Sequence, residues 1–204
     1  MPSTPPHPPE NPTGAGGFFP SYNAAADFLN RNLSAGRGNK VAVIDDAGSY
    51  TYAALAERVS RCANALRGLG LQSEQRIALC LTDTVDFPTS FLGAIKAGMV
   101  PIPLNTYMAP SDYAYVLADA RAQAAIVSDA RVAVFLEAAR LARWCGRLIV
   151  SGNDSGELPG LSWLLESASP EAETAPTRPD DVCFWLYSSG STGSPRARSI
   201  FRPA

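Results

Sequence analysis

The chain has 204 residues, of which 46% are hydrophobic and 18% are charged, and its formal net charge is -2. This length allows one large domain or two small ones, and the apolar content is typical of a globular chain rather than a disordered one. Because the 17 Lys and Arg residues gather in no basic stripe, we expect no nucleic-acid partner. The apolar runs are only strand-sized, so we expect no membrane partner. The composition leaves the oligomeric state open.

The cysteines and the single histidine limit the chemistry further. The four cysteines form no C-x-x-C pair and lie in apolar stretches, so we expect buried, reduced thiols at Cys62, Cys80, Cys145 and Cys183. Reduced thiols favour a cytoplasmic location. His7 lies in a proline-rich stretch, which leaves no base for a Ser-His-Asp or Cys-His mechanism. A metal site with histidine ligands is equally disfavoured, and we assign no catalytic residue and no metal ligand.

Hydrophobic periodicity predicts an order of helices and strands. Residues 1–20 are rich in Pro and Gly and are predicted to form a mobile arm. The expected elements that follow are a helix at 23–33, short strands at 41–44 and 50–52, a helix at 51–70, a strand at 77–81, a helix at 88–98, an extended edge segment at 100–104, a helix at 112–120, a strand at 124–128, a helix at 132–142 and a strand at 148–150. This alternation predicts an α/β fold with a mostly parallel sheet that helices cover on both faces.

The same pattern predicts a division into parts. Residues 21–150 are expected to form an α/β subdomain, in which Lys96 is a solvated helix residue. Residues 151–181, rich in Ser, Gly, Glu and Pro, are expected to form a connector with one short helix at 161–166. Residues 182–204 would then hold the first strand and the loop of a truncated second subdomain. Because that strand would lack its sheet partners, we expect aggregation or disorder from about Val182 onward.

A loop near residue 190 has the composition of a phosphate site. The apolar run from Cys183 to Tyr187 predicts a buried strand, and it leads into Ser188-Ser189-Gly190-Ser191-Thr192-Gly193-Ser194-Pro195-Arg196. Taken alone, a Ser- and Gly-rich stretch indicates a linker or surface turn. The strand before it and the cation after it favour a loop that wraps backbone N–H groups and hydroxyls around a phosphate. Its glycine spacing fits neither a P-loop nor a dinucleotide fingerprint.

The sequence Y-S-S-G-S-T-G-x-P-R resembles the first ATP-phosphate motif of the adenylate-forming superfamily, which includes acyl- and aryl-CoA synthetases. The likeness covers about residues 19 to 196 and includes the segments 49–55, 91–98, 100–106 and 112–119. The segments 22–25, 45–48 and 94–98 are similar to those of benzoate-CoA and hydroxybenzoate-CoA ligases in particular. The resemblance implies the N-terminal part of that family's large domain.

The resemblance also implies a two-step reaction. A small-molecule carboxylate attacks the α-phosphate of ATP, held with Mg²⁺, to give an acyl-adenylate and pyrophosphate. The thiol of coenzyme A then takes the acyl group and releases AMP. Hydrogen bonds to the phosphates would come from Ser188, Ser189, Ser191 and Thr192. Gly190 and Gly193 would let the backbone approach, and Arg196 would balance charge on the leaving group.

The resemblance leaves three readings open. The family's later motifs and its C-terminal catalytic domain have no counterpart in these residues. We therefore expect the chain alone to be inactive and to bind none of ATP, Mg²⁺ and CoA stably. One alternative is a piece of a fatty-acyl-CoA ligase or of another adenylation-domain enzyme. The other alternative is a non-catalytic α/β binding module.

The likeness to the family is lost abruptly at Arg196. The family usually has Lys at this position, then Gly and a short run that contains His, whereas this chain continues Ala-Arg-Ser-Ile-Phe-Arg-Pro-Ala. One codon choice for residues 196–202, with a single A added in front, encodes Lys-Gly-Thr-Val-His-Phe-Pro.

We therefore predict a one-base deletion at codon 196, with an artificially shortened chain as the competing account. Determining the nucleotide sequence tests this prediction. It fails if neither shifted frame encodes a continuation like Gly-Thr-Val-His.

Overall fold

The computed structural model of the protein describes residues 21–152, 156–189 and 195–200, and of residues 188, 189 and 195–200 it describes the backbone alone. The helices are α1 (Ala24–Ser34), α2 (Tyr52–Gly68), α3 (Asp86–Lys96), α4 (Pro110–Asp119), the 3₁₀ turn η1 (Asp129–Arg131), α5 (Val132–Leu141) and α6 (Leu161–Ser167). The strands are β1 (Val41–Asp45), β2 (Gly48–Thr51), β3 (Arg76–Cys80), β4 (Val100–Pro103), β5 (Ala124–Ser128), β6 (Arg147–Ser151), β7 (Phe184–Ser189) and β8 (Pro195–Ile200). The predicted arm at residues 1–20 lies outside the described residues.

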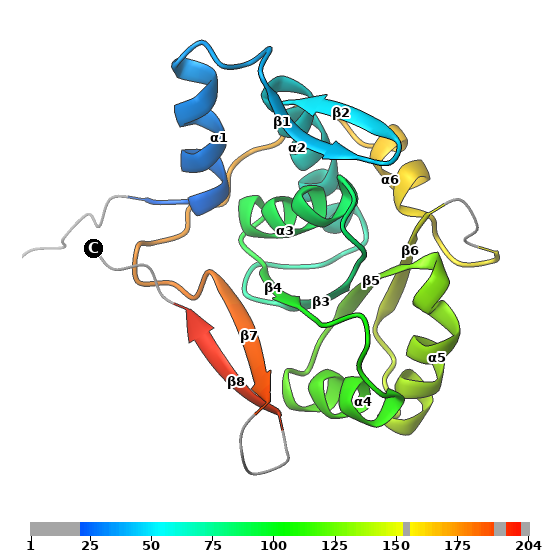
Figure 1. Ribbon diagram of the computed structural model, residues 1–204. Helices are drawn as coiled ribbons and strands as arrows, with labels where there is room; N and C mark the ends of the chain where they lie inside the picture. Colours follow the sequence, from blue (N-terminus) through cyan, green and yellow to red (C-terminus); the bar gives the residue numbers. More distant parts are fainter. Residues whose placement is uncertain (1–20, 153–155, 190–194, 201–204) are drawn as a thin grey trace, which may run out of the picture.

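A parallel sheet with the strand order β4-β3-β5-β6 forms the centre of the fold. Helices α2, α3 and α6 cover one face, and α4 and α5 cover the other (Figure 1). Along β3, Ile77 and Leu79 face the first layer of helices, whereas Ala78 and Cys80 face the second, and all four are fully buried. Strands buried on both faces must be apolar at every buried position, which is why β3 is a continuous apolar run from Ile77 to Cys80. The predicted α/β fold is confirmed.

Strand β4 is one edge of this sheet, as its prolines predict. The N–H groups of Val100 and Leu104 donate to Gln75 O and Leu79 O, each at 2.9 Å. Between them, Pro101 and Pro103 occupy the alternate positions, whose N–H groups would otherwise point to the open edge. The edge therefore offers no donors to a further strand. Strand β7 lies beside β4 without joining the sheet.

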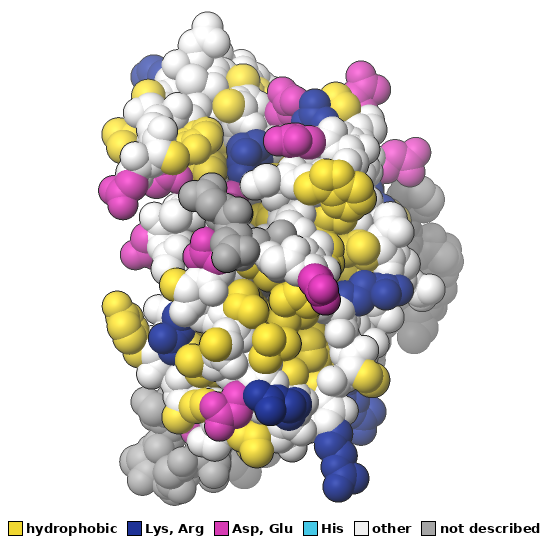
Figure 2. Space-filling model, turned by 90° about the vertical axis from the view of Figure 1, so that its right-hand side faces the viewer, with side chains coloured by type: hydrophobic (Ala, Val, Ile, Leu, Met, Phe, Trp, Pro, Cys, Tyr) yellow, Lys and Arg dark blue, Asp and Glu magenta, His cyan; other side chains and the backbone are white. Residues whose placement is uncertain are grey.

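Strand β6 forms the opposite edge, next to α5 and α6. On the face of the molecule that Figure 2 shows, acidic and basic side chains are scattered and apolar side chains gather in the middle. The large apolar side chains exposed on α5 and α6 are Leu136, Leu141 and Trp163. No basic stripe crosses this face of the described residues, in keeping with the sequence. Within the described ranges, no helix combines the length and apolar character that a membrane crossing requires.

Helices α2 and α3 pack in close contact. A Cβ atom at Gly93 of α3 would lie 2.7 Å from both Cβ and Sγ of Cys62 on α2, so only glycine allows this approach. Cys62 is fully buried, and burial raises the pKa of its thiol to about 12. The expectation of a solvated Lys96 is wrong, because its Nζ donates to Ser60 Oγ at 2.9 Å across the same contact. Burial, and then the charge of Arg67, lower the pKa of Lys96.

The cysteines are confirmed as free thiols, but not all of them are buried. Cys62 and Cys80 lie in the core, and Cys183 is partly buried, which raises the pKa of its thiol. Cys145 is exposed. The prediction fails there because Cys145 lies in the turn between α5 and β6, where the apolar neighbours in the sequence do not surround it in space.

Strand β7 is present, but it is only partly buried and Leu186 is exposed, so the prediction of a buried strand is wrong, as is the expectation that it lacks a partner. It pairs antiparallel with β8, from Phe184 opposite Ile200 to Ser189 opposite Pro195. The pairing is possible because main-chain N–H and C=O groups can form a ladder with almost any sequence. The division at residues 150 and 181 into subdomain, connector and second unit stays a prediction.

Five helices end in the same backbone motif with different residues. Gly36, Gly70 and Gly98 take the left-handed position after α1, α2 and α3, whereas Arg121 and Arg143 take it after α4 and α5, both at φ 49°. After α5, the N–H of Arg143 donates to Arg140 O at 3.1 Å and that of Trp144 to Ala139 O at 2.8 Å. This is the Schellman pattern, which glycine adopts without a Cβ penalty and arginine does not.

We predict that Arg143→Gly raises the free energy of unfolding by about 1 kcal/mol, because it removes this penalty. Chemical denaturation followed by circular dichroism measures the change. The matched control is Arg140→Gly, another exposed position, inside α5, which should lower the free energy of unfolding by about 1 kcal/mol. Changes of the same sign at the two positions would contradict the account.

Candidate phosphate-binding site

The predicted phosphate motif begins at the end of β7. Ser188 and Ser189 are the last two residues of that strand, and Arg196 stands on β8 directly opposite Ser188. The structure thus brings the two ends of the motif together on paired strands. Gly190, Ser191, Thr192 and Gly193 lie outside the described residues, as do the side chains of Ser188, Ser189 and Arg196. The roles of these residues in binding phosphate stay predictions.

The first residue of β7 is held by aromatic packing. The ring of Phe184 meets that of Phe91 on α3 edge-on, with centroids 5.3 Å apart and planes at 69°. Phe91 in turn stacks on Phe87 at 6.0 Å. Edge-on and offset aromatic pairs are favoured by the charge distribution of the rings. The start of β7 is therefore fixed to the helix that packs most closely on α2.

The middle of β7 is held by a cation over an aromatic ring. The guanidinium carbon of Arg76 lies 5.7 Å from the ring centroid of Trp185. Arg76 is itself fixed, because its Nε donates to Ala120 O at 2.8 Å and its Nη1 donates to Glu74 O at 3.1 Å. A cation held over the face of an indole attracts it electrostatically. This contact joins β7 to the first residue of the central strand β3.

The end of β7, next to the motif, is held by a hydrogen bond. Tyr187 donates its hydroxyl proton to Asp119 Oδ2 at 2.6 Å, and Asp119 is the last residue of α4. Burial raises the pKa of Tyr187, and the neighbouring carboxylate raises it further because it would repel the phenolate. The phenol therefore stays a donor at neutral pH. This bond fixes the residue that directly precedes Ser188.

A polar hollow of about 400 Å³ lies at the carboxyl ends of β3, β5 and β6. Ligands of open α/β sheets usually bind at this edge. Here the polar groups bond to one another: Asp86 accepts from Arg58 at 2.6 Å and from Ser151 at 2.7 Å. The N–H of Val85 donates to Asp45 and lowers the pKa of that carboxyl. Among the residues described, no three His, Cys, Asp or Glu side chains are placed to hold a metal ion.

Residues 30–197 match the AMP-binding enzyme family. The chain is 53% identical over 176 residues to the benzoate–CoA ligase of Thauera aromatica, a match that covers 86% of this chain and 33% of the relative. The crystal structure of a benzoate CoA ligase from Burkholderia xenovorans LB400 superposes with a TM-score of 0.79 at 40% identity, over 88% of this chain and 34% of the other.

An anthranilate CoA ligase, solved in complex with anthranoyl-AMP, superposes with a TM-score of 0.85 at 28% identity, over 89% of this chain and 35% of the other. The chain spans about a third of the length of the relatives that it matches. The resemblance inferred from the motifs is confirmed by these matches. The chain belongs to the AMP-binding enzyme family.

Proposed function

We propose that this chain is the phosphate-binding part of an ATP-dependent aryl-carboxylate CoA ligase of the benzoate type. The observation that carries the proposal is the motif Y-S-S-G-S-T-G-x-P-R, which begins on a strand anchored at its start, middle and end. The 53% identity to a benzoate–CoA ligase supports the choice of an aromatic acid. We also propose a cytoplasmic location, supported by the free thiols.

In the proposed reaction, a carboxylate oxygen of the acid attacks the α-phosphorus of ATP and the bond to the bridging oxygen of pyrophosphate breaks. The motif would hold the β- and γ-phosphates. The hydroxyls of Ser188, Ser189, Ser191 and Thr192 and the backbone N–H groups would donate to phosphate oxygens, and Gly190 and Gly193 would let the backbone come close. Arg196 would balance the charge of the departing pyrophosphate.

Arg196 stands where the family usually has Lys. A guanidinium is planar and can donate two parallel hydrogen bonds to a phosphate, whereas an ammonium is a compact point charge. Mg²⁺ would accompany the nucleotide, and the thiol of CoA would take the acyl group in the second step.

We predict weak, phosphate-directed binding of ATP to this chain. One loop makes few of the contacts of a nucleotide site, so a dissociation constant on the order of 1 mM is expected. In titrations of the ¹⁵N-labelled chain, tripolyphosphate should shift the amide signals of Tyr187, Ser188 and Ser189 as strongly as ATP does. Adenosine should not shift them.

Variants separate binding by the motif from attraction to charge in general. Arg196→Ala should weaken tripolyphosphate binding about tenfold, the effect of losing one hydrogen bond from a charged group. The matched control is Arg198→Ala, which removes the same charge two residues further along β8 and should leave the binding nearly unchanged. Equal weakening by both variants, or equal shifts with adenosine, would contradict the proposal.

A further inference from the structure

The segment that leads to β7 follows a fixed path without regular structure. We call residues 168–177 the strap. It leaves the end of α6, crosses α2 and α3, and approaches β7, and it is drawn in orange in Figure 1. Ala175 within it is only 8% exposed. A segment outside helices and strands needs other partners for its main-chain groups, and these partners determine its path.

Three side chains of α2 supply those partners. Arg61, Asn64 and Arg67 recur at every third residue and therefore lie along one side of the helix. We call them the clamp. Arg61 Nη1 donates to Ala168 O at 2.6 Å, and to Leu165 O of α6 at 3.4 Å. Asn64 Nδ2 donates to Ser169 O at 2.9 Å and to Glu171 O at 2.7 Å. Arg67 Nη1 donates to Glu173 O at 2.9 Å.

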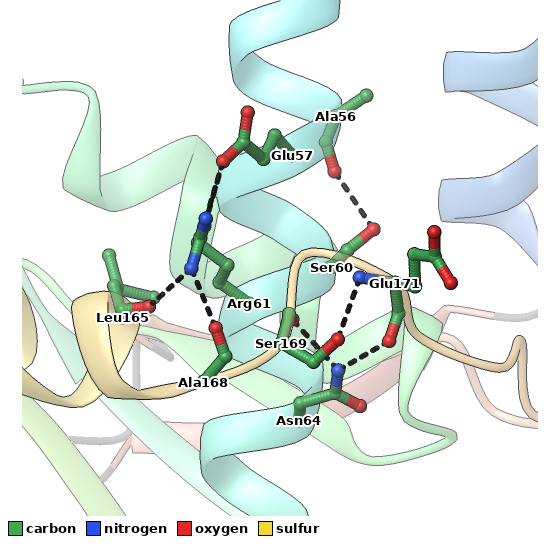
Figure 3. Close-up of polar contacts among 9 residues, drawn as sticks. All are labelled: Ala56, Glu57, Ser60, Arg61, Asn64, Leu165, Ala168, Ser169 and Glu171. Atoms are coloured by element: carbon green, nitrogen blue, oxygen red, sulfur yellow. Dashed lines mark hydrogen bonds and ion pairs between the residues drawn. The ribbon is translucent and has the colours of Figure 1, made fainter.

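Every acceptor that the strap offers to the clamp is a main-chain carbonyl. Figure 3 shows Arg61 and Asn64 reaching from the helix to the backbone of the strap rather than to its side chains. The clamp therefore fixes where the chain runs, whatever side chains the strap carries. Hydrogen bonds from a charged guanidinium are stronger than those between neutral groups. Arg61 and Arg67 donate such bonds, whereas Asn64 is a neutral donor.

Glu57 orients the first clamp residue. Arg61 Nε donates to Glu57 Oε1 at 2.8 Å, and Glu57 lies one turn earlier on α2 (Figure 3). One side of the guanidinium thus faces the carboxylate, while Nη1 faces the strap. The planar fork of arginine allows both contacts at once, which lysine could not reproduce.

The strap is also held beyond the clamp. The N–H of Ala175 donates to Lys96 O at 2.9 Å, which ties the strap to α3 as well as to α2. Thr177 Oγ1 donates to Tyr22 O at 2.6 Å, and the N–H of Tyr22 donates to Thr177 O at 2.6 Å. These bonds fix the last residue of the strap before the turn that leads into β7.

We propose that Arg61, Asn64 and Arg67 are positioning residues for β7, and through it for the phosphate motif. They hold the backbone of the strap as far as Glu173, and together with the bonds of Ala175 and Thr177 they set the point from which the chain turns into the strand. That the position of β7 affects ATP binding rests on the proposed function, whereas the positioning of β7 by the clamp does not. The side chains of the clamp therefore determine the position of β7, whereas the exposed side chains of the strap do not.

Hydrogen exchange of the whole chain without nucleotide, followed by mass spectrometry, tests the proposal. Asn64→Leu keeps the size of the side chain and removes its donor, and Arg67→Met removes a single bond at the exposed end of the clamp. In both variants, amides of the strap and of residues 184–187 should exchange about tenfold faster, whereas amides of β3 should be unchanged. The matched control, Glu173→Ala, truncates a strap side chain, keeps the carbonyl that Arg67 binds, and should change nothing.

Three results would overturn the proposal. Faster exchange in the strap with unchanged exchange at 184–187 would mean that the clamp does not position β7. No change in the strap would mean that the bonds do not hold it. Equal acceleration at β3 in both variants would make the clamp a general stabiliser. Titration of the same variants with tripolyphosphate reports on the motif separately, so a failure of phosphate binding leaves the exchange result intact.

Discussion

A parallel sheet that is apolar on both faces is stable only while helices cover both of them, and the other features of this chain depend on that constraint. Covering one face of the sheet brings α2 and α3 so close together that Gly93 of α3 has no room for a side chain beside Cys62. With its apolar side turned to the sheet, α2 presents Arg61, Asn64 and Arg67 to the strap. The prolines of β4 close one edge, and β7 stays outside the sheet.

The link from this core to the proposed chemistry runs through β7. The strand carries the motif, and separate contacts to α3, β3 and α4 hold Phe184, Trp185 and Tyr187. A phosphate site gains from such rigidity, because donors that are already in place lose little entropy when the anion binds. The relatives are about three times as long as this chain, and one of them is an anthranilate CoA ligase solved in complex with anthranoyl-AMP.

Local signals in the sequence predicted most of the fold and only part of the candidate site. Thr51 caps α2, Gly70 and Gly98 end helices, and two prolines mark an edge strand, because each effect depends on one residue and its neighbours. Arg121 and Arg143 also follow helix ends in the left-handed conformation, although arginine does not favour that conformation. The motif was recognisable, but its supports were not. Asn64 bonds to carbonyls more than 100 positions away, and a main-chain acceptor has no signature in the sequence.

A chimera that places this chain within a longer relative tests whether its fold supports the proposed chemistry. In the benzoate–CoA ligase of Thauera aromatica, the segment that matches residues 30–187 would be replaced by those residues of this chain, leaving the relative's own loop and later parts in place. Pyrophosphate release that depends on benzoate and ATP would be measured. We expect a folded chimera with a rate within about tenfold of the parent. A folded chimera slowed by about a hundredfold or more, the loss expected when catalytic groups are displaced by about 1 Å, would contradict this expectation.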